Sequence, residues 1–209
     1  MEWKERGREI FVIILAIVLL AVSISFRDTT IMYAAFLSFA VIILANIIAK
    51  KITAYLLEAD VKIKFWSWYQ YGLKKGSHFK KPLPMAWLPL LLSLISQGLI
   101  WWMAILEFDV KPRTERVSRR HGLYRFTEMT GGHLALIATV GIITNLVLGV
   151  IGYVAGFELF AKLSIFYAAW SLVPISNLDG TKILFGSRGL WFTMFVILAV
   201  FLGWGLSII

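Results

Sequence analysis

The 209-residue chain contains no cysteine, so neither a disulfide nor a thiolate metal site can form in it. Charged residues make up only 16% of the chain, and the 12 acidic residues are outnumbered by 21 lysines and arginines. Hydrophobic residues account for 59%, and the mean hydropathy is +0.79, which is far from the composition of a soluble domain. In a membrane protein, a net charge of +9 reflects orientation in the bilayer, and no nucleic-acid partner is expected.

Long hydrophobic runs are what the sequence does have. A helix of about 20 apolar residues crosses the ~30 Å hydrocarbon core of a bilayer. Six segments qualify as candidates: Ile10–Phe26, Ile31–Ala49, Met85–Leu106, Leu134–Val154, Leu159–Val173 and Leu190–Ile209. The N-terminal segment resembles a signal sequence, but without a small-residue cleavage site it is expected to remain as an anchor.

The distribution of lysine and arginine indicates how many of these segments cross. If all six cross, with the N-terminus inside, 12 cations lie inside and 9 outside, which fits the positive-inside rule poorly. If Met85–Leu106 enters and leaves on one side, the numbers become 19 and 2. Pro84, Pro89 and the triplet Ser96-Gln97-Gly98 interrupt that segment, and irregular backbone is tolerated at membrane depth where protein or water satisfies it.

The sequence therefore predicts a single integral membrane domain, residues 1–209, of the all-α polytopic class in the cell membrane. Five transmembrane helices and one re-entrant or interfacial segment place the N-terminus in the cytoplasm and the C-terminus outside. A small cytoplasmic β element is expected as well, because Val61–Trp66 alternates between polar and apolar residues and Leu123–Met129 does so more weakly.

Two stretches in the second half of the chain resemble the core of the site-2 proteases, the intramembrane zinc metalloproteases. "VPISNLDGTKILFGSR" is similar to the family's Leu-Asp-Gly motif, although Pro174 and Ser176 also suit a simple loop. "GIITNLVLGVIG" is similar to the preceding core helix, with Gly141 and Asn145 in its Gly-x-x-x-Asn pattern. The resemblance extends from about residue 8 to 200 and is closest to small archaeal-type members. It implies core helices at about 31–58, 134–154 and 159–182, and the candidate binding residues Asn145, Asn177, Asp179 and Gly180.

The other half of that family's site, HExxH, is degenerate in this chain. The resemblance places Asn46 and Lys50 where the two zinc-binding histidines belong, and Ile47 where the catalytic glutamate belongs, so the segment reads Asn46-Ile47-Ile48-Ala49-Lys50. A protonated Lys50 repels Zn²⁺, and Asp179 alone cannot hold it, so zinc is predicted to be lost and no catalytic residue to be intact. His78, His121 and His133 lie outside the aligned site; a metal site built from His121, Glu128 and His133 remains an alternative.

These observations favour a catalytically inactive pseudoprotease that binds transmembrane segments of other proteins. The alternatives are a scaffold subunit of a larger membrane complex and an active intramembrane metalloendopeptidase that uses other residues. In place of zinc, an ion pair between Lys50 and Asp179 is expected to join the two core helices, because each charge would otherwise be buried alone. Alternatively, Lys50 extends to the cytoplasmic interface without a partner.

Overall fold

The computed structural model describes residues 2–70, 78–113 and 129–207. The helices are α1 (Glu2–Ile24), η1 (Thr29–Ile31), α2 (Met32–Leu56), α3 (Leu88–Ile95), α5 (Gly131–Val154), α6 (Glu158–Leu172), α7 (Asp179–Gly186) and α8 (Arg188–Ser207). The strands are β1 (Ala59–Phe65), β2 (Ser67–Gln70), β3 (His78–Pro84) and β4 (Leu106–Pro112). The described residues are mainly helical, and the strands form two small sheets, β1–β4 and β2–β3.

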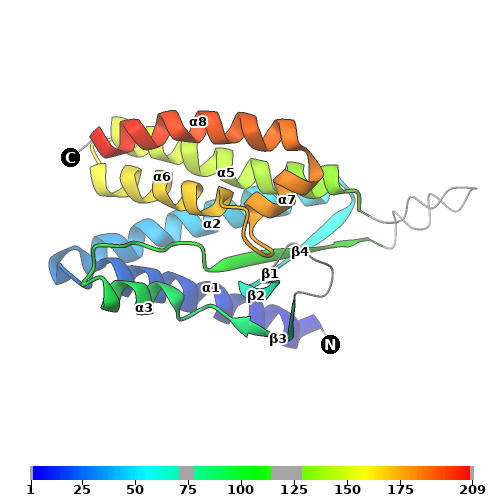
Figure 1. Ribbon diagram of the computed structural model, residues 1–209, viewed down its shortest axis with the longest axis horizontal. Helices are drawn as coiled ribbons and strands as arrows, with labels where there is room; N and C mark the ends of the chain where they lie inside the picture. Colours follow the sequence, from blue (N-terminus) through cyan, green and yellow to red (C-terminus); the bar gives the residue numbers. More distant parts are fainter. Residues whose placement is uncertain (1, 71–77, 114–128, 208–209) are drawn as a thin grey trace, which may run out of the picture.

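Long helices run back and forth between two ends of the molecule (Figure 1). The N-terminus, the strands and α7 lie at one end, which we call the strand end, and the C-terminus lies near the other, where α1 turns into α2 and α5 turns into α6. Pro174 follows the end of α6, since proline cannot continue a helix. At the strand end, Thr130 caps α5 by accepting a hydrogen bond from the backbone N–H of His133.

Four stretches within these helices are long and apolar enough to cross a membrane: Arg6–Ile24, Thr29–Leu56, Gly131–Val154 and Arg188–Ser207. Their outward faces carry large apolar side chains such as Phe11, Ile52 and Val200, each more than half exposed. Apolar surface on this scale suits a lipid bilayer. The fifth expected span corresponds to α6, whose 15 residues extend only about 22 Å.

The segment Met85–Leu106 leaves the strand end and returns to it (Figure 1). It begins after β3, forms the eight-residue helix α3 and runs without regular structure into β4. Its helix α3 contacts the end of α1, where Ser23 Oγ donates to the Pro89 carbonyl at 2.9 Å and Ser93 Oγ donates to the Ser23 carbonyl at 2.5 Å. This out-and-back path is compatible with a re-entrant segment, and the topology in the membrane stays a prediction.

The strand expected at Val61–Trp66 is present as β1, whose burial alternates as the sequence does, with Val61 and Ile63 buried. Its partner is the antiparallel strand β4, in a register that pairs Ile63 with Phe108. The partner suggested by the sequence, Leu123–Met129, lies outside the described residues apart from Met129. β4 is a correction to the sequence-based expectation, in which Leu106 ends a hydrophobic segment and residues 107–132 form a cytoplasmic loop.

Cysteine labelling can test the orientation, because the chain has no cysteine of its own. Lys81→Cys in β3 and Lys111→Cys in β4 should react from the cytoplasmic side of sealed vesicles, since both exposed positions lie at the strand end. Asp28→Cys and Phe157→Cys, in the turns at the opposite end, should react only from the outside. Labelling of the Lys81 and Lys111 positions from opposite sides would mean that Met85–Leu106 crosses fully.

Candidate functional site

The first part of the site is the buried face of α2. Asn46, Ile47 and Lys50 all lie on this face and are less than 7% exposed. Asn46 and Lys50 are four residues apart, so their side chains project from the same side of the helix. A lysine on the buried face of an apolar helix needs a counter-charge, because an isolated charge at such a position is expensive.

The counter-charge comes from the first residue of α7. After α6 ends at Leu172, residues 173–178 form a short loop, in which Ser176 has a left-handed backbone (φ 50°) and donates from Oγ to the Ser67 carbonyl at 3.1 Å. Asp179 then begins α7, a position where the helix dipole favours a carboxylate. The turn of α7 approaches α6 so closely that a Cβ at Gly180 would overlap the Leu172 carbonyl.

Lys50 and Asp179 meet in the interior. The Lys50 Nζ lies 2.5 Å from Asp179 Oδ2, and their side chains are 8% and 5% exposed. Gly141 on α5 makes room for the lysine, since a Cβ there would lie 2.5 Å from Lys50 Cε. Asn46 completes this side of the site by donating from Nδ2 to the Gly141 carbonyl at 2.9 Å. The pair thus joins α2 to α7, with α5 packed against the lysine.

Phe108 of β4 and Lys182 of α7 complete the surroundings of the ion pair. The ring centroid of Phe108 lies 4.9 Å from Lys50 Nζ and 3.8 Å from Lys182 Nζ, so the aromatic face contacts two cations. Lys182 Nζ also donates to the Phe108 carbonyl at 2.5 Å. Burial lowers the pKa of Lys182 to about 8, although the negative charge of Asp179 acts in the opposite direction. The ion pair is therefore accompanied by a second lysine, and the buried carboxyl of Glu107 lies close enough to Lys182 to act on its pKa.

The remaining candidate residues divide between the interior and the surface. Asn145 is fully buried on α5, one turn beyond Gly141, and its carbonyl accepts a hydrogen bond from Ser164 Oγ at 2.7 Å. Neither polar atom of its side chain has a partner among the described residues, and the same is true of Asp179 Oδ1. Asn177, in contrast, is exposed in the loop before α7. The structure therefore brings Asn46, Lys50 and Asp179 together and leaves Asn177 outside.

An amide and an ammonium are poor zinc ligands, and the one carboxylate of the pair is too few to hold zinc by itself. In the described part of the chain, no group of three or more histidine, aspartate or glutamate side chains is placed to hold a metal ion. His133 lies at the start of α5, where its Nδ1 is 2.8 Å from Thr130 Oγ1, and His121 and Glu128 of the alternative metal site lie outside the described residues. The predicted loss of zinc remains a prediction.

Compared with protein-family models, with curated proteins and with solved structures, the chain matches none. The chemistry of the site therefore has to be inferred from its own residues and from the resemblance in its motifs.

Replacing the charges of the buried pair singly and together tests whether they stabilise each other. Lys50→Met or Asp179→Leu alone should lower the free energy of unfolding by roughly 3–5 kcal/mol, because each leaves a buried unpaired charge. The double variant should lose much less, so that a thermodynamic cycle measured by denaturation in detergent shows strong coupling.

The exposed pair Lys64–Asp109, which joins β1 to β4, supplies the control. Its cycle should give a coupling of about 1 kcal/mol or less, because water screens exposed charges. Additive losses for the Lys50 and Asp179 variants would mean that the two charges do not interact.

Proposed function

We propose that the protein is a site-2-protease-like membrane protein without protease activity that binds segments of other membrane proteins. The observation that carries the proposal is the buried Lys50–Asp179 ion pair. By the resemblance in the motifs, it lies where the proteases bind zinc. An ammonium there opposes a divalent cation electrostatically, and one of the two Asp179 carboxylate oxygens, Oδ2, already accepts from Lys50.

The position that matches the family's catalytic glutamate also carries no residue that could act as a general base. Ile47 replaces the glutamate that would take a proton from water, and an aliphatic side chain cannot accept one. Two other buried titratable groups lie nearby: Lys182, whose pKa is lowered by burial to about 8, and Glu107, whose pKa is raised by burial and which accepts from the Ser67 N–H. Neither stands at the position that the resemblance assigns to the family's glutamate. The Lys50–Asp179 pair is suited to holding α2 and α7 together rather than to hydrolysis.

A binding role is supported by the ribbon of β1 and β4. One hydrogen bond lies at each end of the β1–β4 ribbon: the Arg113 N–H donates to the Glu58 carbonyl, and the Trp66 N–H donates to the Ile105 carbonyl. Between these two ends, hydrogen-bonded and non-hydrogen-bonded residue pairs alternate, as they do in any antiparallel pair of strands. The backbone groups of Phe108 and Val110 therefore point away from β1, towards the outer edge of β4. The Phe108 carbonyl already accepts from Lys182, so Val110 is the residue at which an extended peptide can add to this edge as a further strand.

The position of this edge connects it with the ion pair. Lys182 of α7 donates to the Phe108 carbonyl on the same outer edge, and Phe108 also contacts Lys50. In the proposed topology the strand end is cytoplasmic, so an unwound end of a transmembrane helix would reach β4 as it leaves the bilayer. We therefore place the bound segment along the outer edge of β4, beside α7.

Site-specific capture tests this function. A photoreactive benzophenone side chain introduced at Lys111, the exposed position near the end of β4, should capture single-span membrane proteins in native membranes. Val110→Pro in the same chain removes an outward N–H and should lower capture about five-fold, the effect of one hydrogen bond of ~1 kcal/mol. Val110→Thr keeps the N–H and serves as the matched control.

The melting temperature of each variant in detergent would show that Val110→Pro is folded. Equal capture by the Val110→Pro and Val110→Thr variants would contradict binding at the β4 edge. A fixed, stoichiometric set of partners purified with the protein would favour the scaffold-subunit function instead.

Metal analysis and a cleavage assay test the missing activity. The purified protein should contain no stoichiometric zinc and should leave transmembrane substrates intact, because the site offers a single carboxylate. About one zinc per chain, surviving replacement of all three histidines, would contradict the proposal. Restoring Asn46→His, Ile47→Glu and Lys50→His together is not expected to restore activity by itself, because the groups that orient zinc ligands must also be present.

A further inference from the structure

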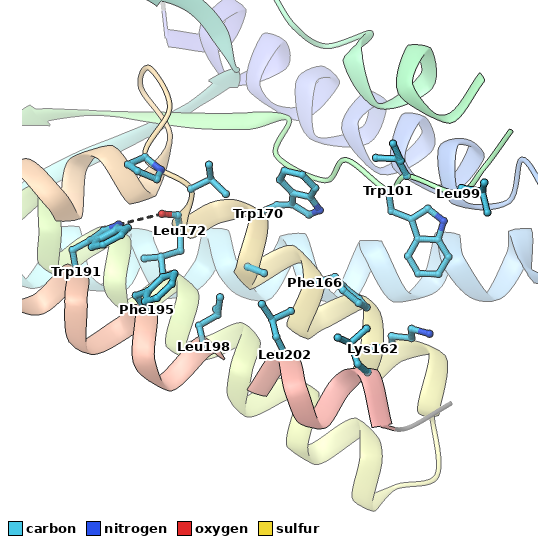
Figure 2. Close-up of a pocket in the computed structure, with 15 residues that line it drawn as sticks. Leu99, Trp101, Lys162, Phe166, Trp170, Leu172, Trp191, Phe195, Leu198 and Leu202 are labelled. Carbon is cyan, nitrogen blue, oxygen red and sulfur yellow. Dashed lines mark hydrogen bonds between the residues drawn. The ribbon is translucent and has the colours of Figure 1, made fainter. Parts of the chain in front are cut away.

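A groove of about 820 Å³ lies between α6, α8 and the chain that follows α3, on the other side of α6 from α2 (Figure 2). We call it the α6–α8 groove. Its lining is almost entirely apolar and includes Leu99, Trp101, Phe166, Trp191, Leu198 and Leu202. It extends along α6 from Lys162 near one end to Leu172 at the other, where Trp191 Nε1 donates to the Leu172 carbonyl at 3.3 Å.

Lys162 is the only charged residue among the fifteen described residues that line the groove. It lies in the first half of α6, towards the end of the molecule opposite the strands. Its Nζ is 5.7 Å from the ring centroid of Trp101, and no carboxylate among the described residues forms a salt bridge with it. A cation without an acidic partner, next to a tryptophan at one end of an apolar groove, is suited to a phosphate at the membrane interface.

The layout of the groove favours a phospholipid as its occupant. Lys162 and Leu172 are ten residues apart, so they are separated by about 15 Å along the helix. Over that length the lining is apolar apart from the one ammonium near its end. A phospholipid has the same layout, with a charged headgroup at one end and apolar acyl chains over the rest.

We propose that the α6–α8 groove binds an anionic phospholipid, with its headgroup phosphate at Lys162 and its acyl chains along α6 and α8. In the proposed topology Lys162 lies on the outer side, so the lipid belongs to the outer leaflet. The bound chains cover the apolar side chains between Trp101 and Trp191, and the headgroup supplies the negative charge that Lys162 lacks. This site is separate from the ion pair and does not depend on the proposed binding at β4.

Native mass spectrometry of the full chain tests the proposal, with phosphatidylglycerol and phosphatidylcholine as the two lipid probes. The unaltered protein should retain phosphatidylglycerol about five-fold better than phosphatidylcholine, since one lysine near an anionic lipid contributes on this scale. Lys162→Gln should abolish the preference, whereas Arg27→Gln, an exposed cation at the same end of the molecule, should keep it.

Filling the groove tests the position of the acyl chains. Ala169→Phe introduces a ring into the groove and should lower retention of both lipids, while Val154→Phe, at a surface position of α5 that is 80% exposed, should leave it unchanged. A photoreactive benzophenone at Phe195 should label phosphatidylglycerol. A preference that survives Lys162→Gln, retention that survives Ala169→Phe, or labelling of a protein instead of lipid at Phe195 would each overturn the proposal.

Discussion

A buried ammonium and a buried carboxylate can remain charged in an apolar helix bundle only beside each other, and the arrangement around Lys50 and Asp179 follows from this requirement. α2 must present Lys50 on its buried face, and α7 must begin at Asp179. Gly141 on α5 leaves room for the lysine in this position, because a Cβ there would lie 2.5 Å from Lys50 Cε. The contacts between α2, α5 and α7 are therefore constrained by one electrostatic contact as well as by apolar packing.

A second constraint concerns backbone without regular structure. The chain between α3 and β4 runs through the molecule as irregular backbone, whose polar groups cannot be left unpaired in a lipid environment. Serine side chains and tryptophan rings supply some of the partners: Ser96 Oγ accepts from the Ile100 N–H, and Trp101 Nε1 donates to the Gly98 carbonyl. Trp102 packs against Trp170, with ring centroids 4.4 Å apart, which holds this chain against α6. The irregular segment is thus tied to the helices by its own side chains.

Much of this arrangement could be predicted from the sequence, since helix periodicity and alternation depend on neighbouring residues. The ion pair between Lys50 and Asp179 is one such prediction, and the two side chains do meet. It rests on the resemblance, which places their helices together, and on the cost of burying either charge without a partner. The strand β4 was missed although Leu106-Glu107-Phe108-Asp109-Val110-Lys111 alternates strictly. Leu106, the first residue of β4, is also the last residue of a long hydrophobic run. The run therefore hides the point at which the irregular apolar pattern gives way to the alternation of a strand.

Other features of the site depend on contacts between residues distant in sequence, and no local pattern contains them. Phe108 lies against both lysines only because β4 returns past α7, and Lys182 could be recognised beforehand only by its position three residues after Asp179. Asn177 looked equivalent to Asp179 in the motif, yet it is exposed, since the loop before α7 turns it outwards. The order of residues in a loop does not determine which of them face the interior.

The separation of Lys50 and Asp179 by 129 residues has a consequence for biosynthesis. At the usual 5–20 residues per second, a ribosome needs roughly 6–26 s to make the intervening chain. During that interval α2 has left the ribosome with a lysine whose partner has not been made. Lys50 lies only six residues before the end of α2, close enough for its flexible side chain to reach the hydrated lipid headgroups. The ammonium can thus stay hydrated at the headgroups until α7 is made and packs against α2. Formation of the Lys50–Asp179 pair is therefore a late step in assembly of the bundle.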